Sequence, residues 1–156
     1  MQGSAVAAVA DAVLAASRAL VAVAARSLAS ADDEVTLPQY RVLVALCARG
    51  PLGMRDLSEE LRCSGSTATR LCDRLVARGL IDRRHRSDDR REVRVEATRG
   101  GERLVRRVTD HRRSEIEAIV ASIPARQREA LVGAFQAFAT AAGEVRDQAW
   151  STGWQL

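Results

Sequence analysis

A short amphipathic helix followed directly by a charged hairpin, between residues 64 and 97, restricts the fold more than any other feature of this sequence. Ser64 is suited to cap the helix and Gly79 to end it, because a hydroxyl satisfies free backbone amides and glycine adopts the left-handed conformation. The apolar stripe of this helix consists of Ala68, Leu71, Cys72 and Leu75. A strand is predicted at residues 80 to 81, and the alternation of side chains over residues 93 to 97 predicts its partner.

Helices are predicted on both sides of this unit. Thr36 and Gln39 form a capping box with Pro38 between them, which predicts the start of a helix that Gly50-Pro51 ends. The other helices are predicted at residues 4 to 28, 54 to 61 and 98 to 123, and after Pro124. The predicted order is α-α-α-α-β-β-α-α, a mostly α fold with a small β-hairpin.

Length and composition fit one compact protein with a polyanionic partner. The chain has 156 residues, of which 47% are hydrophobic and 28% charged, so a core can form. The formal net charge is +4, and all 24 basic residues are arginine. The planar guanidinium suits phosphates and guanine edges better than an ammonium group does.

Several other classes of protein are disfavoured. The sequence contains no G-x-S-x-G, H-E-x-x-H or phosphate-loop motif, so we predict no enzyme. Its three cysteines lack metal-ligand spacing and its two histidines are far apart, so we predict no metal and no cofactor. The apolar segment at residues 4 to 25 is interrupted by Asp11 and Arg18, which indicates a packing helix. We therefore expect a cytoplasmic protein with no membrane partner.

The helix at residues 54 to 61 and the helix after Ser64 are predicted to form a helix-turn-helix, whose second helix can lie in a DNA major groove. Hydroxyl side chains at its start allow close approach to the duplex, and Arg70 and Arg74 suit guanine edges or phosphates. The predicted DNA-binding residues of this helix are Ser64, Ser66, Thr67, Thr69, Arg70 and Arg74. A solvated polar face is the alternative, but the charged hairpin that follows favours DNA.

The hairpin tip, with the sequence DRRHRSDDRR at residues 82 to 91, is predicted to be a wing that reaches the adjacent minor groove. Arginines alone would repel one another, whereas Asp88 and Asp89 can pair with neighbouring guanidiniums and hold one arginine at a fixed angle. Such an exposed pair is worth only ~0–1 kcal/mol, so its role would be orientation. A solvated turn is the alternative.

Two segments carry a family resemblance. They are the run STATRLCDRLVARGLIDR and the motif Asp89-Arg90-Arg91 followed by Val93, Val95, Thr98 and Gly101. Residues 36 to 105 resemble the winged-helix core of the MarR (multiple antibiotic resistance regulator) family. The resemblance implies a dimer built from the first, fifth and sixth helices, repression from palindromic operators, and release by a small ligand or an oxidant. It also implies DNA binding by Asp89, Arg90 and Arg91, with Arg91 in the minor groove.

The terminal helices are predicted to need a second copy of the chain. They are apolar but lie outside a winged-helix core that is self-sufficient, and long helices with unburied faces commonly pack against another copy. We therefore expect residues 35 to 98 to form the DNA-binding domain, and residues 1 to 34 and 99 to 156 to form a helical dimerisation region. The expected partners are an inverted-repeat duplex, a second copy and a small-molecule effector.

Two alternatives stay open for the function. Cys63 lies at the turn before the DNA-reading helix, so its oxidation would disturb that helix and make the protein a redox-sensing repressor. The opposing interpretation is that all three cysteines are structural: Cys47 and Cys72 are small core residues, and Cys63 is incidental. The second alternative is a winged-helix module that binds a protein and not DNA, which would require exposed apolar residues on the reading face.

Overall fold

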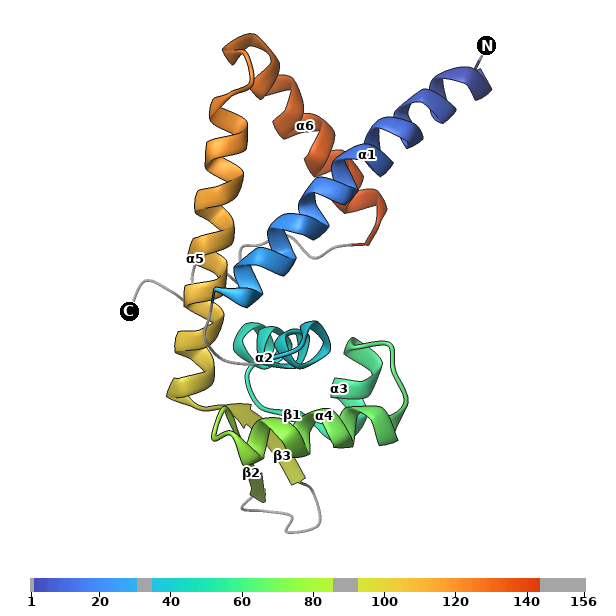
Figure 1. The fold of residues 1–156 in the computed structure, drawn as a ribbon. Coiled ribbons are helices and arrows are strands. Elements are labelled where there is room, and N and C mark those ends of the chain that lie inside the picture. Colours follow the sequence, from blue (N-terminus) through green and yellow to red (C-terminus); the bar gives the residue numbers. More distant parts are fainter. Residues whose placement is uncertain (1, 31–34, 86–92, 144–156) are drawn as a thin grey trace.

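A computed structural model of the protein describes residues 2–30, 35–85 and 93–143. In this part of the chain six α-helices and three β-strands follow one another (Figure 1). They are α1 (Gln2–Ala29), α2 (Leu37–Arg49), β1 (Leu52–Gly53), α3 (Met54–Glu60), α4 (Gly65–Ala77), β2 (Ile81–His85), β3 (Val93–Ala97), α5 (Arg99–Ala121) and α6 (Ala125–Ala141). The mostly helical fold with a β-hairpin wing is confirmed, and the predicted helix bounds differ by at most a few residues.

The hydrophobic core lies in the lower half of the molecule, where α2 is surrounded by α4, α5 and the sheet (Figure 1). Its fully buried side chains include Leu43, Leu46, Leu57, Leu75, Ile81, Val95 and Leu104. Most of these buried side chains are aliphatic, and Tyr40 is the aromatic member of the described core cluster. The winged helix-turn-helix elements therefore share one core with the first half of α5, which contributes Leu104, Val105 and Val108.

The start and end of α2 follow from its sequence. The backbone amide of Thr36 donates a hydrogen bond of 2.9 Å to Oε1 of Gln39, as a capping box requires. Pro38 lies in the first turn, where a backbone amide would have no carbonyl to bind, so the lack of an amide in proline costs nothing. Gly50 ends the helix with φ of 76°, a conformation that other residues adopt only with strain.

The sheet has one strand more than the sequence predicts. Its order is β1-β3-β2, antiparallel throughout, with Ile81 paired to Ala97 and His85 to Val93. The third strand, β1, pairs Leu52 with Val95 on the other side of β3. Two residues are too short for an alternating pattern, so only the tertiary contact reveals this strand.

The first turn of α5 is held against the turn between α4 and β2. The hydroxyl of Thr98 accepts a 3.2 Å hydrogen bond from the Gly101 amide and donates a 2.8 Å bond to the Gly79 carbonyl. A Cβ atom on Gly101 would lie 2.3 Å from the carbonyl oxygen of Leu80, so only glycine fits here without a shift. These contacts fix the direction in which α5 leaves the core.

Helix α1 and the far half of α5 project away from this core, and α6 runs back from the far end of α5 (Figure 1). The C-terminal half of α1 contacts α5, with Val23 and Ser27 fully buried, whereas α6 buries none of its residues. Among the described residues, α1 is the one helix whose length and apolarity would suffice to cross a membrane. That is weak evidence for a span, because length and composition alone also fit helices that pack against protein.

Candidate nucleic-acid interface

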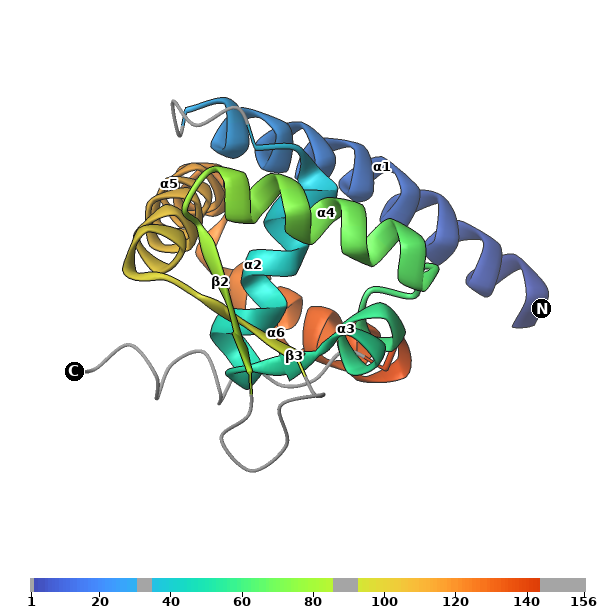
Figure 2. The same ribbon diagram turned by 90° about the horizontal axis from the view of Figure 1, so that it is seen from below.

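Helix α4 lies on the surface beside the β2–β3 hairpin, and we call these two elements the reading helix and the wing (Figure 2). Helix α3 packs against the reading helix, and a four-residue turn joins the two helices. In this turn Arg62 adopts φ of 51°, the left-handed conformation that favours glycine. The predicted helix-turn-helix is thus present, and Arg62 is an exposed cation beside the reading helix that sequence reasoning did not single out.

The reading helix separates a buried face from a polar face, as predicted. Ala68, Cys72 and Leu75 have no exposed surface and fix the helix on the core. On the opposite side Ser64, Ser66, Thr69, Arg70 and Arg74 are exposed, and Thr67 is half-buried. The structure therefore brings all six predicted residues of this helix together along one edge of the molecule.

Three hydroxyl groups cluster at the start of the reading helix. Oγ of Ser64 accepts a 3.2 Å hydrogen bond from the Thr67 amide and lies 3.0 Å from Oγ of Ser66. One turn further on, the hydroxyl of Thr69 donates a 2.9 Å bond to the carbonyl of Gly65. Ser64 therefore caps the helix as predicted, and each hydroxyl oxygen keeps accepting capacity on the exposed side.

The two arginines of the reading helix have no described ion-pair partner, whereas the aspartate between them has one. Arg70 and Arg74 are exposed, and within the described residues their guanidinium groups have no hydrogen bond or ion pair. The carboxylate of Asp73, in contrast, accepts a 2.5 Å bond from Nη2 of Arg83 on strand β2. The reading helix thus presents free positive charge, and its exposed aspartate is neutralised by the wing.

Strand β2 continues to His85, so the prediction that the hairpin tip begins at residue 82 is wrong: residues 82–85 pair in register with β3. The strands of the wing are described, but residues 86–92 lie outside the described residues. The predictions for Asp89, Arg90 and Arg91 fall on this tip and stay predictions. Within the strands, Nε of Arg84 forms an ion pair with Glu96 across β2 and β3. The wing therefore extends from the core beside the reading helix, as the sequence predicts.

The cysteines give no support to a sensor built on Cys47 or Cys72. Burial raises the pKa of both thiols to about 11, and for Cys47 the nearby Glu102 acts in the same direction. A thiol with such a pKa holds its proton at neutral pH and reacts slowly, because the thiolate is the nucleophile. Cys63 is half-buried against the core cluster. In the parts of the chain that the structure describes, no three metal-ligating side chains gather in one place.

A polar cluster joins α1, α2 and α5 where the projecting helices meet the winged-helix core. Nε of Arg112 on α5 donates a 3.3 Å bond to Oγ of the buried Ser27 on α1. The same guanidinium lies over the ring of Tyr40, 5.5 Å from its centre, and the Tyr40 hydroxyl is 3.3 Å from that of Thr109. Nη2 of Arg112 is buried without a hydrogen-bond partner among the described residues.

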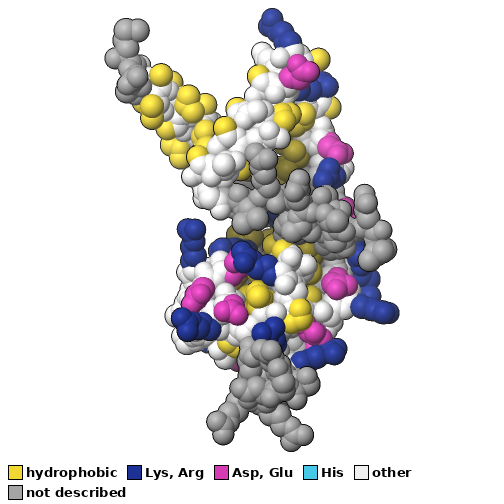
Figure 3. Space-filling view, turned by 180° about the vertical axis from the view of Figure 1, so that it is seen from behind, with side chains coloured by type: hydrophobic (Ala, Val, Ile, Leu, Met, Phe, Trp, Pro, Cys, Tyr) yellow, Lys and Arg dark blue, Asp and Glu magenta, His cyan; other side chains and the backbone are white. Residues whose placement is uncertain are grey.

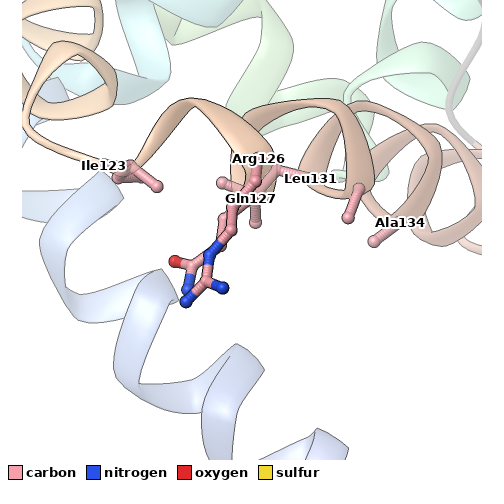
Figure 4. A pocket seen from close by; sticks show the side chains of 6 residues that line it. Ile123, Arg126, Gln127, Leu131 and Ala134 are labelled. Carbon is pink, nitrogen blue, oxygen red and sulfur yellow. The ribbon is translucent and has the colours of Figure 1, made fainter.

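The projecting helices expose a large apolar surface, which we call the arm surface (Figure 3). Its members come from α1, α5 and α6, and several are at least half exposed, such as Val6 at 69% and Phe138 at 53%. They are Val6, Val9, Leu14, Leu20, Val21, Ile119, Val120, Val132, Phe135 and Phe138. Helix α6 also carries an open hollow, lined by Ile123, Arg126, Gln127, Ala130, Leu131 and Ala134 (Figure 4). All these lining residues belong to α6 and the turn before it, so the hollow is one-sided.

Comparisons with known proteins place this geometry in a family. The MarR family model matches residues 35–93. The crystal structure of RV1404 from Mycobacterium tuberculosis shares 44% identity and a TM-score of 0.81, over 86% of this chain and 92% of that one.

A search of curated proteins found no match to the chain. Two further solved structures are similar to it. NadR in complex with 4-hydroxyphenylacetate is similar at 25% identity and a TM-score of 0.60, over 81% of this chain and 87% of that one. A MarR family protein from Bacillus stearothermophilus has the same fold, with a TM-score of 0.82 at 22% identity over 92% of this chain and 99% of that one. With its winged helix-turn-helix and these similarities, the chain belongs to the MarR family of transcriptional regulators.

Proposed function

We propose that this protein is a homodimeric repressor that binds an inverted-repeat duplex in a sequence-specific manner. The observation that carries the proposal is the exposed row of hydroxyl and guanidinium groups on the reading helix, directly beside the wing. In this arrangement the reading helix lies in the major groove and the wing reaches the adjacent minor groove. The protein then acts in the cytoplasm, at the chromosome, without a catalytic step.

Electrostatics support DNA as the partner. Arg70 and Arg74 stand one helical turn apart on the exposed face, and neither is neutralised by a described acidic side chain. Unpaired guanidiniums gain most from phosphates and guanine edges, since no existing ion pair has to be broken. A protein-binding winged helix would need apolar residues on this face, but the one large apolar side chain exposed on α4 is Val76. We therefore favour DNA over a protein partner.

The arm surface supports a second copy of the chain as the other partner. It joins apolar side chains of α1, α5 and α6, and α6 buries no residue within one chain. Burying such helices against a two-fold related copy removes this apolar surface from water. Two reading helices would then face the same side of a duplex, with half-sites about 34–36 Å apart, one turn of DNA.

An aromatic carboxylic acid is the class of effector that we propose for release. Nη2 of Arg112 lies buried without a described partner beside Tyr40, between the projecting helices and the winged-helix core. A carboxylate there would complete the hydrogen bonding of the guanidinium, and a ring would stack near Tyr40. NadR, which has been crystallised with 4-hydroxyphenylacetate, supports this class of ligand.

The effector proposal is tested with 4-hydroxyphenylacetate as the probe. We expect it to raise the melting temperature of the wild-type protein and to release a bound duplex, because it binds one conformation preferentially. Arg112→Gln should abolish both effects, whereas Arg113→Gln, one position along the same helix, should keep them. An equal response of the wild type and Arg112→Gln contradicts this site.

DNA binding is tested by fluorescence anisotropy on duplexes from the region upstream of the gene. We expect tight, salt-dependent binding to an inverted repeat. Arg91→Ala should weaken it, and Arg70→Ala should also relax base preference by roughly 1–3 kcal/mol at one position. Arg113→Ala removes the same charge from the far helix α5 and is the matched control. Full affinity of both site variants would show that these residues do not contact DNA.

The redox alternative makes a different prediction. If Cys63 is the sensor, Cys63→Ser should bind the operator normally but fail to release it after mild peroxide treatment. We expect instead that peroxide leaves operator binding of the wild-type protein unchanged. Release by peroxide that Cys63→Ser prevents would favour the redox sensor.

A further inference from the structure

The reading helix carries an exposed carboxylate on the surface that faces the duplex in the proposed function. Asp73 stands between Arg70 and Arg74, and its side chain is 52% exposed. A negative charge at this place repels phosphates and lowers affinity for every duplex alike. Its presence therefore needs a reason other than attraction to DNA.

The structure gives Asp73 a partner on the wing. Nη2 of Arg83 lies 2.5 Å from Oδ1 of Asp73, so the guanidinium and the carboxylate form a charge-assisted hydrogen bond. Arg83 belongs to β2, and Asp73 to the middle of α4. Among the ion pairs of the described residues, this one joins the two elements that would enter different grooves.

The strand alternation explains how Arg83 reaches the helix. Side chains two apart on a strand share a face, so Arg83 lies on the same face as Ile81, which is fully buried against the core. Its partner in register is Val95, which is also fully buried. At Arg83 the strand passes the end of the apolar core, and the long side chain continues over α4 to Asp73.

This ion pair contributes more to orientation than to stability. The side chains of Arg83 and Asp73 are 38% and 52% exposed, and exposed pairs are typically worth ~0–1 kcal/mol. Beyond Ile81, however, Asp82, Arg83 and Arg84 are all exposed, so the outer half of β2 has little apolar contact to hold it. A polar link to α4 at this point restricts the angle between the wing and the reading helix.

We propose that Asp73 and Arg83 are a positioning pair that sets the wing at the angle required for simultaneous contact with both grooves. This inference rests on the proposed function. The pair makes DNA recognition more selective, because a correctly spaced operator then binds without ordering the wing. Because the charge of Asp73 lowers affinity for every duplex alike, it does not select the operator by itself, and the selectivity comes from the fixed wing.

The test compares an operator duplex with a scrambled duplex of the same length. In Asp73→Asn the affinity for scrambled DNA should rise, and the ratio of the two affinities should fall by up to about fivefold, the limit that an exposed ion pair of ~1 kcal/mol can supply. In Arg83→Gln the affinity for scrambled DNA should fall, and the ratio should fall as much as in Asp73→Asn. The double variant Asp73→Arg with Arg83→Asp should restore the ratio.

The matched control is the ion pair of Arg84 with Glu96, which joins the two strands of the wing. Glu96→Gln removes the same charge as Asp73→Asn and should leave the ratio unchanged. If Asp73 contacts a cytosine directly, Arg83→Gln keeps the ratio and the double variant fails to restore it. If Arg83 contacts only phosphate, its loss weakens both duplexes equally. Either result overturns the positioning pair.

A measurement without DNA separates this inference from the proposed function. Amide hydrogen exchange in β2 and β3 of the free protein should be faster in Asp73→Asn and Arg83→Gln, and normal in the double variant. Exchange in α5 should not change. Unchanged exchange in the wing of both single variants overturns the positioning pair. A wild-type protein that binds no duplex refutes the proposed function, and with it the role of the pair in DNA recognition, while the exchange result still decides whether the pair orders the wing.

Discussion

At the scale of single residues, a glycine determines the packing of α5 as much as any side chain does. Gly101 lets the first turn of α5 approach the carbonyl of Leu80, and Thr98 holds that turn by hydrogen bonds in both directions. Arg62 is the opposite case: a residue with a large side chain adopts the left-handed conformation that favours glycine, in the turn before the reading helix. A functional site retains such strain when the surrounding structure holds it in place.

We predict that Gly101→Ala lowers the free energy of unfolding by about 1–3 kcal/mol, the usual range for overpacking. The new Cβ would lie 2.3 Å from backbone and 3.0 Å from Cδ2 of Leu43, so α5 has to move. Gly65→Ala is the matched control, because a Cβ there meets nothing within 4 Å. Chemical denaturation measures both. A Gly101→Ala protein as stable as the wild type would show that α5 moves at no cost.

At the scale of elements, one carboxylate joins the projecting helix α1 to α5. Oε2 of Glu115 accepts a 2.6 Å bond from Nη2 of Arg26 on α1, and Oε1 lies 3.0 Å from Nε2 of His111. The hydrogen bond from Arg26 lowers the pKa of Glu115 below its ordinary value, and His111 acts in the same direction. The charged form of Glu115 thus favours the docked arrangement of the two helices.

We predict that this docking weakens in acid. A carboxyl whose pKa is lowered by folding contributes stability above its unfolded pKa, and that contribution disappears as the pH falls through the folded pKa. The loss should therefore occur below about pH 4, the ordinary value of glutamate. Glu115→Gln should be less stable at neutral pH and less sensitive to acid, as thermal unfolding at several pH values would measure. Glu117→Gln, on the same helix, is the control. Identical pH profiles of Glu115→Gln and the wild type would contradict this role.

At the scale of the whole molecule, the two halves differ in how far they bury their apolar side chains. The lower half encloses its apolar side chains between α2, α4, α5 and the sheet. The upper half, in contrast, leaves the arm surface open to solvent over α1, α5 and α6 (Figure 3). Removal of that surface from water is the driving force that we expect for assembly.

We predict that Phe138→Glu separates the proposed dimer. A charge within an apolar interface has no partner, so the dissociation constant should rise by about 100-fold or more. The chain should still fold, because Phe138 is 53% exposed within one copy. Sedimentation velocity measures the association, and Leu37→Glu, an exposed position at the start of α2, is the control. A Phe138→Glu protein that stays dimeric would place the interface elsewhere.

The sequence by itself determined the helices, their caps and the polar face of α4. Thr36 and Ser64 are recognised from neighbours within four residues, and the buried stripe of α4 repeats with the helical period. The wing was predictable for the same reason, because its alternation and turn composition are local. These parts of the fold and of the candidate site depend on interactions between residues that are close in the chain.

Only the tertiary structure decided which distant residues meet. The strand β1 exists because Leu52 pairs with Val95, and the pair of Asp73 with Arg83 joins two elements whose periodicities are unrelated. The burial of Nη2 of Arg112 where three helices meet and the lack of buried residues in α6 are likewise set by packing. Periodicity shows which face of an element is apolar, but it does not show which face of another element covers it, because contacts between distant segments leave no local pattern.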